Sequence, residues 1–509
     1  MNGPAAPATA SATLRVRRLG LLTQDEPIVL MRSDCHVSKS EGLASRARVL
    51  LKANGREVIA TLYEVDNDWL DIDEAGLSEA AWTRLRVEEG GALKVRHPPS
   101  LESLADVRRR IYGGRLDGAA FRAIIADIVA GRYADIHLAT FIAACSAFAL
   151  DVEEITHLTR AMVDAGAKLS WGEAIVADKH CIGGLPGNRT TPIVVAIAAS
   201  LGLIMPKTSS RAVTSPSGTA DAMETLAPVA LELAEMRRVI EAEGACIAWG
   251  GAMALSPADD VLIRIERALD IDTEGQLIAS VLSKKIAAGA THVVLDLPVG
   301  PTAKLRDRER FVRLRKLFEY VSDQIGISTT VVATDGSQPI GRGIGPWLEA
   351  RDVMRVLERH PEAPRDLEER AVLLAGHVLE FDPALRGGQG IVRARELLHS
   401  GAALAKMRRL IAAQGAPPHA TSLGTLTHDV PATEDGVVTA IDCLRLARVA
   451  RLAGAPMDKG AGVDLFKRIG DPVERGEPLY RIHAAFEADF RFATQLAAAG
   501  DGMTIGRRE

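Results

Sequence analysis

The middle of the chain alternates short apolar segments with longer amphipathic ones, and this alternation most constrains the fold. From about residue 171, five segments have the length and apolar content of buried strands: IVADKH, LIMPK, CIAWGG, HVVLDLPVG and STTVVATDG. Between them lie segments with helical periodicity: PIVVAIAASLG, DAMETLAPVALELAEMRRVIEAEG, QLIASVLSKKIAAG and RERFVRLRKLFEYVSDQIG. This order predicts an α/β fold with a mainly parallel sheet flanked by helices, over residues 169–425.

The flanking regions have different patterns and predict three further domains. Residues 1–95 contain short apolar and alternating runs, which predict an extra β-rich N-terminal domain with a hairpin turn at Asn54–Gly55. Residues 96–168 have helical periodicity and predict a small helical domain. Residues 430–509 combine strand-like and helix-like segments, which predict a small C-terminal α/β or α+β domain.

Composition and charge exclude several classes of protein. Hydrophobic residues make up 47% of the chain and charged residues 25%, as in ordinary globular proteins. The net charge of −5 and the aromatic content of 4% argue against binding of a nucleic acid polymer. The five cysteines form no CxxC pair, so we expect neither a disulfide framework nor a zinc ribbon. No other metal-ligand cluster is visible in the sequence, so we expect no metal site.

No segment has the pattern of an export signal or a membrane span. The longest uncharged stretch, from Thr190 to Pro206, has 17 residues and contains Pro192 and Gly202. A buried helix followed by a buried strand explains it better than a bilayer span. We therefore expect a cytoplasmic protein that does not bind membranes.

A glycine-rich loop follows the first predicted strand of the central domain. It reads DKHCIGGLPGNRTT from Asp178 to Thr191. Glycines allow backbone N–H groups to approach an anion, the start of the next helix adds a favourable dipole, and Lys179 adds a charge. The loop lacks the GxxxxGK[ST] pattern of a nucleotide-binding P-loop. It predicts an anion site, with a plain strand–turn–helix connection as the alternative.

A hydroxyl-rich loop follows the second predicted strand. Positions 208–219 hold seven Ser and Thr residues, and Lys207 and Arg211 add positive charge. Short hydroxyl donors around a guanidinium suit a phosphate, because they can bind it from several directions. The alternative is a flexible linker, which the position between a buried strand and a long predicted helix disfavours.

A third polar segment lies on a predicted helix. TEGQ at 273–276 fits a capping box, so Thr273 should begin the helix. Gln276, Ser280 and Lys284 then recur on one face, and taken alone this pattern is typical of a solvated polar face. Lys304 follows the strand HVVLDLPVG and so should lie at the same edge of the sheet.

These motifs together resemble one enzyme family. DKHCIGG, SSRAVTSPSGTAD and SVLSKK, in this order and spacing, resemble the signature of the thymidine/pyrimidine-nucleoside phosphorylases. The resemblance runs from about residue 100 to 500 and includes LADVRRRIYGGRLDGAAF in the helical domain. The chain is also similar to the archaeal AMP phosphorylases, which share the N-terminal domain, the IGGLPGN segment and the position of Lys304.

The resemblance implies phosphorolysis by a pentosyltransferase. Inorganic phosphate attacks the anomeric carbon of a nucleoside or a nucleoside 5′-monophosphate and releases a free base and a pentose 1-phosphate. The substrate would be thymidine, or AMP giving adenine and ribose 1,5-bisphosphate. The resemblance also implies small-molecule substrates, phosphate as co-substrate without a cofactor, and a homodimer or larger homo-oligomer.

The resemblance also assigns residues to roles. The family's phosphate ligands match Lys179, Thr191, Ser209 and Thr219. Its base and sugar contacts match His180, Ser280 and Lys284, and the proton donor of the AMP phosphorylases matches Asp272. Lys179, His180 and Asp272 are thus the predicted catalytic residues. The nucleotide-binding positions of the AMP phosphorylases match Gly184, Ser210, Arg211, Ala212, Val213, Thr214, Ser215, Thr219, Ser280 and Lys304.

Two departures from the family pattern bear on the substrate. Cys181 stands where pyrimidine phosphorylases have Ser, and Ile265 stands where they have an Arg that contacts the pyrimidine. Lys304 and the N-terminal domain favour a nucleoside 5′-monophosphate instead.

Two other functions remain as alternatives. A phosphoribosyltransferase of anthranilate type shares the general fold but would need an acidic metal–diphosphate motif. A non-catalytic binding protein would have no reason to keep Lys179, Arg211, Asp272 and Lys284 together.

Overall fold

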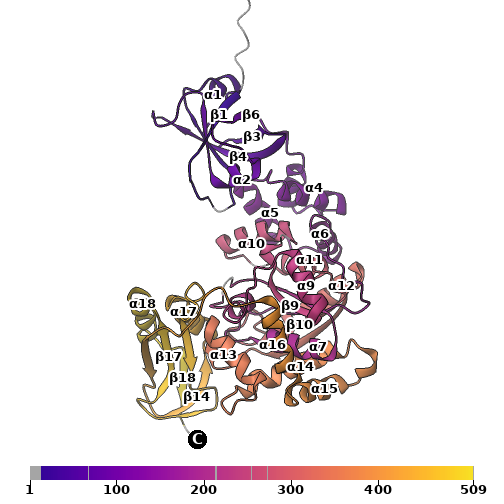
Figure 1. The fold of residues 1–509 in the computed structure, drawn as a ribbon, viewed down its shortest axis with the longest axis vertical. Helices are drawn as coiled ribbons and strands as arrows, with labels where there is room; N and C mark the ends of the chain where they lie inside the picture. The colour runs from indigo at the N-terminus through magenta and orange to yellow at the C-terminus, as the bar shows by residue number, and fades with distance from the viewer. Residues whose placement is uncertain are drawn as a thin grey trace, which may run out of the picture. The chain divides into compact units, whose positions relative to one another are not determined.

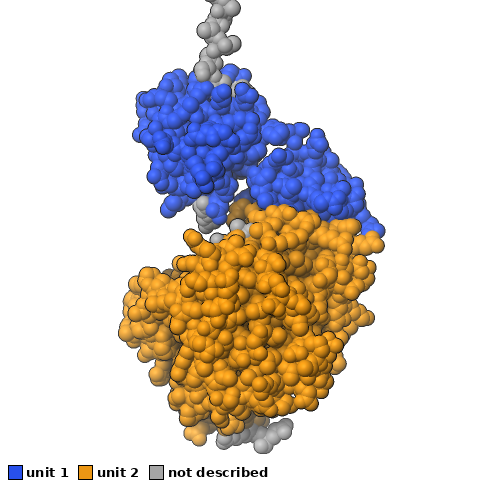
Figure 2. Space-filling view, turned by 45° about the vertical axis from the view of Figure 1, so that its right-hand side comes forward, with its two compact units in different colours: residues 1–144 blue, residues 145–509 orange. Residues whose placement is uncertain are grey.

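The computed structural model describes residues 13–23, 25–66, 68–212, 215–253, 255–271 and 273–507. Three predicted site residues, Val213, Thr214 and Asp272, lie outside the described residues. The chain forms two compact units, Met1–Ala144 and Cys145–Glu509, which Figure 2 colours separately. The predicted functional loops all belong to the second unit.

The first unit contains a closed barrel of six strands in the order β1-β5-β2-β4-β3-β6. The strands are β1 (Thr13–Arg18), β2 (Ile28–Arg32), β3 (Arg48–Ala53), β4 (Arg56–Val65), β5 (Glu74–Leu77) and β6 (Ala92–Arg96), and α1 (His36–Glu41) and α2 (Glu79–Leu85) accompany them. The β-rich prediction is confirmed. Asn54 and Gly55, with φ of 51° and 71°, form the predicted two-residue turn between β3 and β4.

The predicted helical region follows the barrel. It consists of α3 (Leu104–Ile111), α4 (Gly118–Val129), α5 (Asp135–Ala147) and α6 (Val152–Asp164). The boundary between the two units falls within α5.

A parallel sheet forms the centre of the second unit (Figure 1). Its strands are β7 (Ala177–Cys181), β8 (Met205–Ser209), β9 (Ala245–Trp249), β10 (His292–Val299) and β11 (Ser328–Asp335). The order is β11-β10-β7 in one part and β8-β9 in the other, and a parallel bridge between Val176 and Ile204 joins the parts. The mainly parallel sheet of the prediction is confirmed.

Helices cover both faces of this sheet. On β10, Val293, Leu295 and Leu297 pack in a cluster with α6, α11 (Glu274–Ala287) and α12 (Arg308–Ile325). Val294 points the other way, into the cluster of α7 (Thr190–Leu201), α13 (Pro346–Leu357), α14 (Arg365–Leu379), α15 (Gln389–His399) and α16 (Ala402–Gln414). Both faces of β10 are therefore buried, which explains its continuous apolar run.

One expectation for the central domain is wrong. The predicted long helix from residue 221 to 244 is two helices, α8 (Thr219–Met223) and α9 (Leu233–Glu243). Pro228 lies between them and disfavours a helix at this point, and the Trp249 N–H donates to the carbonyl of Val229 at 2.7 Å. The polar face of α11 is only partly exposed, since Gln276 is 4% exposed and the side chain of Lys284 is 30% exposed.

The C-terminal domain of the second unit is α+β. It contains antiparallel sheets in the orders β12-β15-β17-β13 and β16-β14-β18. The strands are β12 (Gly343–Ile344), β13 (Leu426–Pro431), β14 (Gly436–Ile441), β15 (Gly462–Leu465), β16 (Pro472–Val473), β17 (Pro478–Ala484) and β18 (Met503–Gly506). Two helices, α17 (Cys443–Leu452) and α18 (Glu487–Ala498), pack on its apolar core, and α13 lies beside the domain in Figure 1.

Within the described ranges, none of the helices combines the length and the apolar character that crossing a bilayer requires.

Candidate functional site

The predicted functional segments meet at the carboxyl edge of the parallel sheet, where open α/β sheets bind ligands. Arg189, at the end of the glycine-rich loop, donates from Nη1 to Oγ1 of Thr219 at 2.9 Å and from Nη2 to the carbonyl of Ser217 at 3.0 Å. Lys285 of α11 donates to the carbonyl of Thr208 at the end of β8, at 3.4 Å. The structure thus brings together the two loops and α11, which lie far apart in the sequence.

Lys179 is fully buried under the start of α7. Its Nζ donates to Oγ1 of Thr190 at 2.9 Å and to Oγ1 of Thr191 at 3.5 Å, and lies 3.5 Å from Oδ2 of Asp296. Lys179 and Asp296 are both 0% exposed. The ammonium group of Lys179 therefore lies next to the first residues of α7, and the helix dipole adds to the positive potential there.

A second buried charge cluster lies next to Lys179, and of its members only Lys207 was singled out from the sequence. Asp178 accepts from Lys207 at 3.1 Å and pairs with Lys285 at 2.9 Å, and all three side chains are at most 4% exposed. Burial alone would raise the pKa of Asp178, but the two ammonium groups hold it below its usual value. Burial lowers the pKa of Lys207, with Lys285 adding to the effect and Asp178 opposing it.

His180 is held in its neutral form. Its pKa lies well below the usual value, first because of burial and then because of the charges of Lys285, Lys207, Lys284 and Lys179. A neutral imidazole in this position can accept or donate a hydrogen bond without adding charge.

Cys181 has the environment of an inert thiol. Burial, followed by the charge of Asp296, raises the pKa of the thiol to about 12. The side-chain amide of Asn188 donates to Sγ at 3.2 Å and to Oδ2 of Asp296 at 3.4 Å. Cys181 therefore belongs to the polar support of the loop and lacks the features of a nucleophile.

The hydroxyl-rich loop folds back on itself around Asp221. Oδ2 of Asp221 accepts from the N–H of Ala212 at 2.6 Å and from the N–H of Gly218 at 3.0 Å. A Cβ at Gly218 would lie 2.6 Å from the carbonyl oxygen of Ser210, so only glycine allows the two limbs of the loop to approach this closely.

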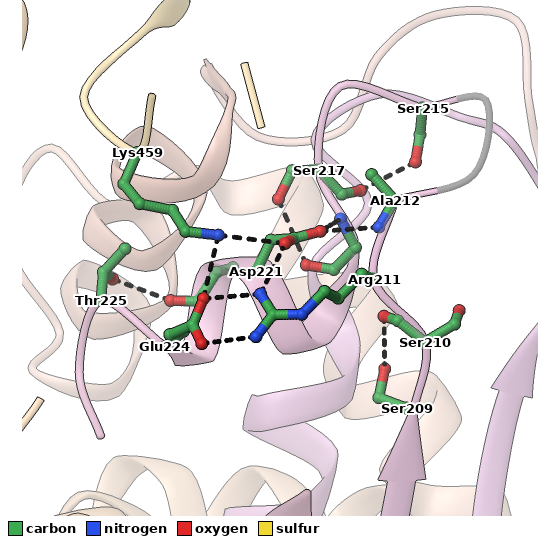
Figure 3. Close-up of polar contacts among 12 residues, drawn as sticks. Ser209, Ser210, Arg211, Ala212, Ser215, Ser217, Asp221, Glu224, Thr225 and Lys459 are labelled. Carbon is green, nitrogen blue, oxygen red and sulfur yellow. Dashed lines mark hydrogen bonds and ion pairs between the residues drawn. The ribbon is translucent and has the colours of Figure 1, made fainter. Parts of the chain in front are cut away.

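Arg211 is engaged by carboxylates of the protein (Figure 3). Its Nη1 and Nη2 donate to Glu224 at 2.6 Å each, and Nη1 also donates to Asp221 at 3.3 Å. The guanidinium carbon lies 4.9 Å from the centre of the Trp249 ring. In this structure Arg211 therefore shapes the loop. The hydroxyl groups of Ser209, Ser215 and Ser217 donate to backbone carbonyls of the same loop.

Arg189 was not singled out from the sequence, but it makes contacts with both loops and with α13. Its Nε donates to Glu349 of α13 at 2.6 Å, and burial raises the pKa of Glu349 while Arg189 opposes the rise. Since Arg189 also holds Thr219, it links the two predicted phosphate-binding loops. Its position directly before Thr190 and Thr191 in the motif was the available signal.

The remaining predicted residues lie at the same edge or near it. Thr273 caps α11 as predicted, accepting from the N–H of Gln276. Ser280 is half-buried on this helix, and Lys284 pairs with Asp259 of α10 (Pro257–Leu269) at 2.8 Å. Gly184 and Lys304 are exposed, Gly184 with φ of +68°.

Among the residues that the structure describes, no three His, Cys, Asp or Glu side chains gather as a metal site would need. The acidic residues that border the two loops are already engaged. Asp178 of β7 pairs with Lys207 and Lys285, and Asp221 of α8 pairs with Arg211 and Lys459.

Three family models match the chain in succession. They describe the helical bundle domain of a glycosyl transferase family at residues 107–166, its a/b domain at 173–404, and a pyrimidine nucleoside phosphorylase C-terminal domain at 437–501. A solved structure of anthranilate phosphoribosyltransferase from Thermus thermophilus has the same fold over 60% of this chain and 98% of its own, with a TM-score of 0.50 and 22% identity.

Curated relatives match almost the whole chain. A protein of Chelativorans sp. named "Putative thymidine phosphorylase" is 55% identical over 99% of this chain and 98% of its own. One of the same name from Tolumonas auensis is 54% identical over 94% of this chain and 95% of its own. The family models and these relatives show a glycosyl transferase of the pentosyltransferase class. Within that class, the chain belongs to the thymidine/pyrimidine-nucleoside phosphorylase family.

Proposed function

We propose that the protein cleaves a nucleoside or nucleoside 5′-monophosphate with inorganic phosphate, yielding a free base and a pentose 1-phosphate. The observation that carries the proposal is the buried Lys179 under Thr190 and Thr191, joined through Arg189 to the hydroxyl-rich loop. Hydroxyl groups, a helix start and a fixed cation together suit a phosphate dianion. Lys179, Thr191, Ser209 and Thr219 are the proposed phosphate ligands.

The proposed mechanism relies on charge stabilisation. Cleavage of the glycosidic bond builds positive charge on the sugar and negative charge on the base. The phosphate stabilises the first, while a proton donor or cation stabilises the second. We assign the base end to His180, Ser280 and Lys284, and the proton donor to Asp272, which lies outside the described residues.

Within this reaction we favour a nucleoside 5′-monophosphate such as AMP over thymidine. Ile265 is buried at 6% exposure on α10, so the residue at the position of the family's pyrimidine-contacting Arg cannot hydrogen-bond a base. Lys304 is exposed five positions beyond the end of β10 and carries a charge suited to a 5′-phosphate. Gly184 and the segment Ser210–Ser215 are the other proposed nucleotide contacts. We expect the enzyme to act as a homodimer or larger homo-oligomer in the cytoplasm.

One experiment tests the reaction and the substrate together. Purified protein is incubated with thymidine, uridine, AMP and other nucleoside monophosphates, with and without phosphate, and free base is quantified. We expect base release that requires phosphate and persists after exhaustive chelation. Turnover that is lost on chelation and restored by magnesium would contradict the proposal and favour the phosphoribosyltransferase alternative. Strong turnover of thymidine with none of any nucleotide would reverse the substrate assignment.

A further inference from the structure

Two carboxylates of α8 and its C-terminal end, Asp221 and Glu224, pair with a lysine from the C-terminal domain. Nζ of Lys459 lies 3.0 Å from Oδ1 of Asp221 and 3.0 Å from Oε2 of Glu224 (Figure 3). These carboxylates are the ones that hold Arg211. Arg211, Asp221, Glu224 and Lys459 therefore form one ion cluster, in which two cations share two anions.

The cluster acts on the backbone of the loop through Asp221. This side chain is 2% exposed and accepts from the N–H groups of Ala212 and Gly218 while it receives Lys459 on its other oxygen. The pKa of Glu224 falls to about 2, chiefly because Arg211 donates to its carboxylate. Burial opposes this decrease in pKa, and a hydrogen bond from Lys459 adds to it. Without Lys459, two carboxylates would share the single charge of Arg211.

Lys459 is itself held firmly in place. Its carbonyl oxygen accepts from the N–H of Trp347 at the start of α13, at 3.0 Å. The backbone next to it is tightly packed, since a Cβ at Gly460 would lie 2.0 Å from the carbonyl oxygen of Ser422. The ammonium group is therefore presented by a fixed segment, and its side chain is 23% exposed.

From this geometry we infer that Lys459 is a positioning residue through which the C-terminal domain sets the conformation of the substrate loop. The inference rests on the proposed function for its catalytic consequence, because that function places Ser209 and Thr219 on phosphate. Its structural consequence, the ordering of the Ala212 and Gly218 amides, does not depend on the reaction.

The test compares Lys459→Met, Lys459→Arg and a matched control, Lys467→Met, in the full-length protein. Lys467 belongs to the same domain and pairs with Glu477 at 2.5 Å, away from the loop. Hydrogen exchange followed by mass spectrometry reports on peptides that contain Ala212 or Gly218. Initial rates of base release give KM and kcat for phosphate and for the nucleotide or nucleoside.

We expect Lys459→Met to speed exchange in those peptides and to raise the KM for phosphate about tenfold, the effect of losing one charge-assisted hydrogen bond, with a smaller change in kcat. Lys459→Arg should restore most of both, and Lys467→Met should alter neither. Combining Lys459→Met with Glu224→Gln should cost less than the sum of the two single changes, because the two residues belong to one cluster.

Unchanged exchange at these peptides in a folded Lys459→Met protein would overturn the inference. So would faster exchange spread equally over the C-terminal domain, which would indicate general destabilisation. If the wild-type protein showed no phosphorolysis at all, the proposed function would fail, and the exchange data alone would decide whether Lys459 orders the loop.

Discussion

Replacing Lys179 by methionine separates its structural contribution from its catalytic one. The change keeps much of the side-chain volume but removes the ammonium group, which leaves the Asp296 carboxylate buried without its cation at 3.5 Å. Two unit charges at this distance attract by roughly 5 kcal/mol at an effective dielectric constant of about 20. Removing one partner of a buried pair typically costs about 3–5 kcal/mol. We therefore expect Lys179→Met to lose about 3–5 kcal/mol of unfolding free energy.

The catalytic loss should be separable from this destabilisation. Loss of one preorganised donor to the phosphate should lower kcat/KM by about 10²–10³. The double variant Lys179→Met/Asp296→Asn removes the uncompensated charge, so it should regain most of the stability but none of the activity. Denaturant unfolding gives the stabilities, and initial rates over a range of phosphate concentrations give the kinetic constants.

A surface pair provides the control. Lys168 pairs with Asp164 at 2.9 Å, and both side chains are more than half exposed. Lys168→Met should therefore change stability by less than about 1 kcal/mol and leave the rate unchanged. A folded Lys179→Met protein with wild-type KM and kcat would refute the assignment of Lys179 to phosphate. Recovery of activity in the double variant would show that Lys179 only neutralises Asp296.

Three further predictions follow from the other residues at the site. Cys181→Ser should retain turnover. Thiol alkylation near pH 7 should not inactivate the wild-type protein, because the pKa of the Cys181 thiol is raised to about 12. Abolished turnover in Cys181→Ser would identify Cys181 as a nucleophile instead. The pKa of His180 is lowered on folding, so the unfolded chain binds the extra proton and stability should fall as pH drops below about 6.5. His180→Gln should flatten this slope by up to about 1.4 kcal/mol per pH unit in unfolding experiments between pH 5 and 7, and an identical slope would contradict the neutral imidazole. Lys304→Ala should lower kcat/KM for AMP about ten- to a hundredfold more than for thymidine, and equal losses on both would assign Lys304 to the shared chemistry.

Much of the fold could be predicted from local patterns. The alternation of apolar strands and amphipathic helices predicts the sheet of β7 to β11, and Asn54–Gly55 predicts the turn between β3 and β4. The break between α8 and α9 was also encoded locally, in Pro228, but the amphipathic periodicity on either side concealed it. Strand and helix periods arise from neighbours a few residues apart, so such features can be read from the chain without its partners.

By itself, the sequence determined the segments that we propose to carry the chemistry: the glycine-rich loop with Lys179, the hydroxyl-rich loop and the helix with Ser280 and Lys284. Only the tertiary structure decided which charges meet. Arg189 and Glu349 are 160 residues apart, and Lys459 and Asp221 are 238 apart. The chain has 61 basic and 66 acidic residues, so composition permits many pairings. The order of the strands and the packing of the C-terminal domain select among them, because only groups buried side by side interact strongly enough to determine each other's position and charge.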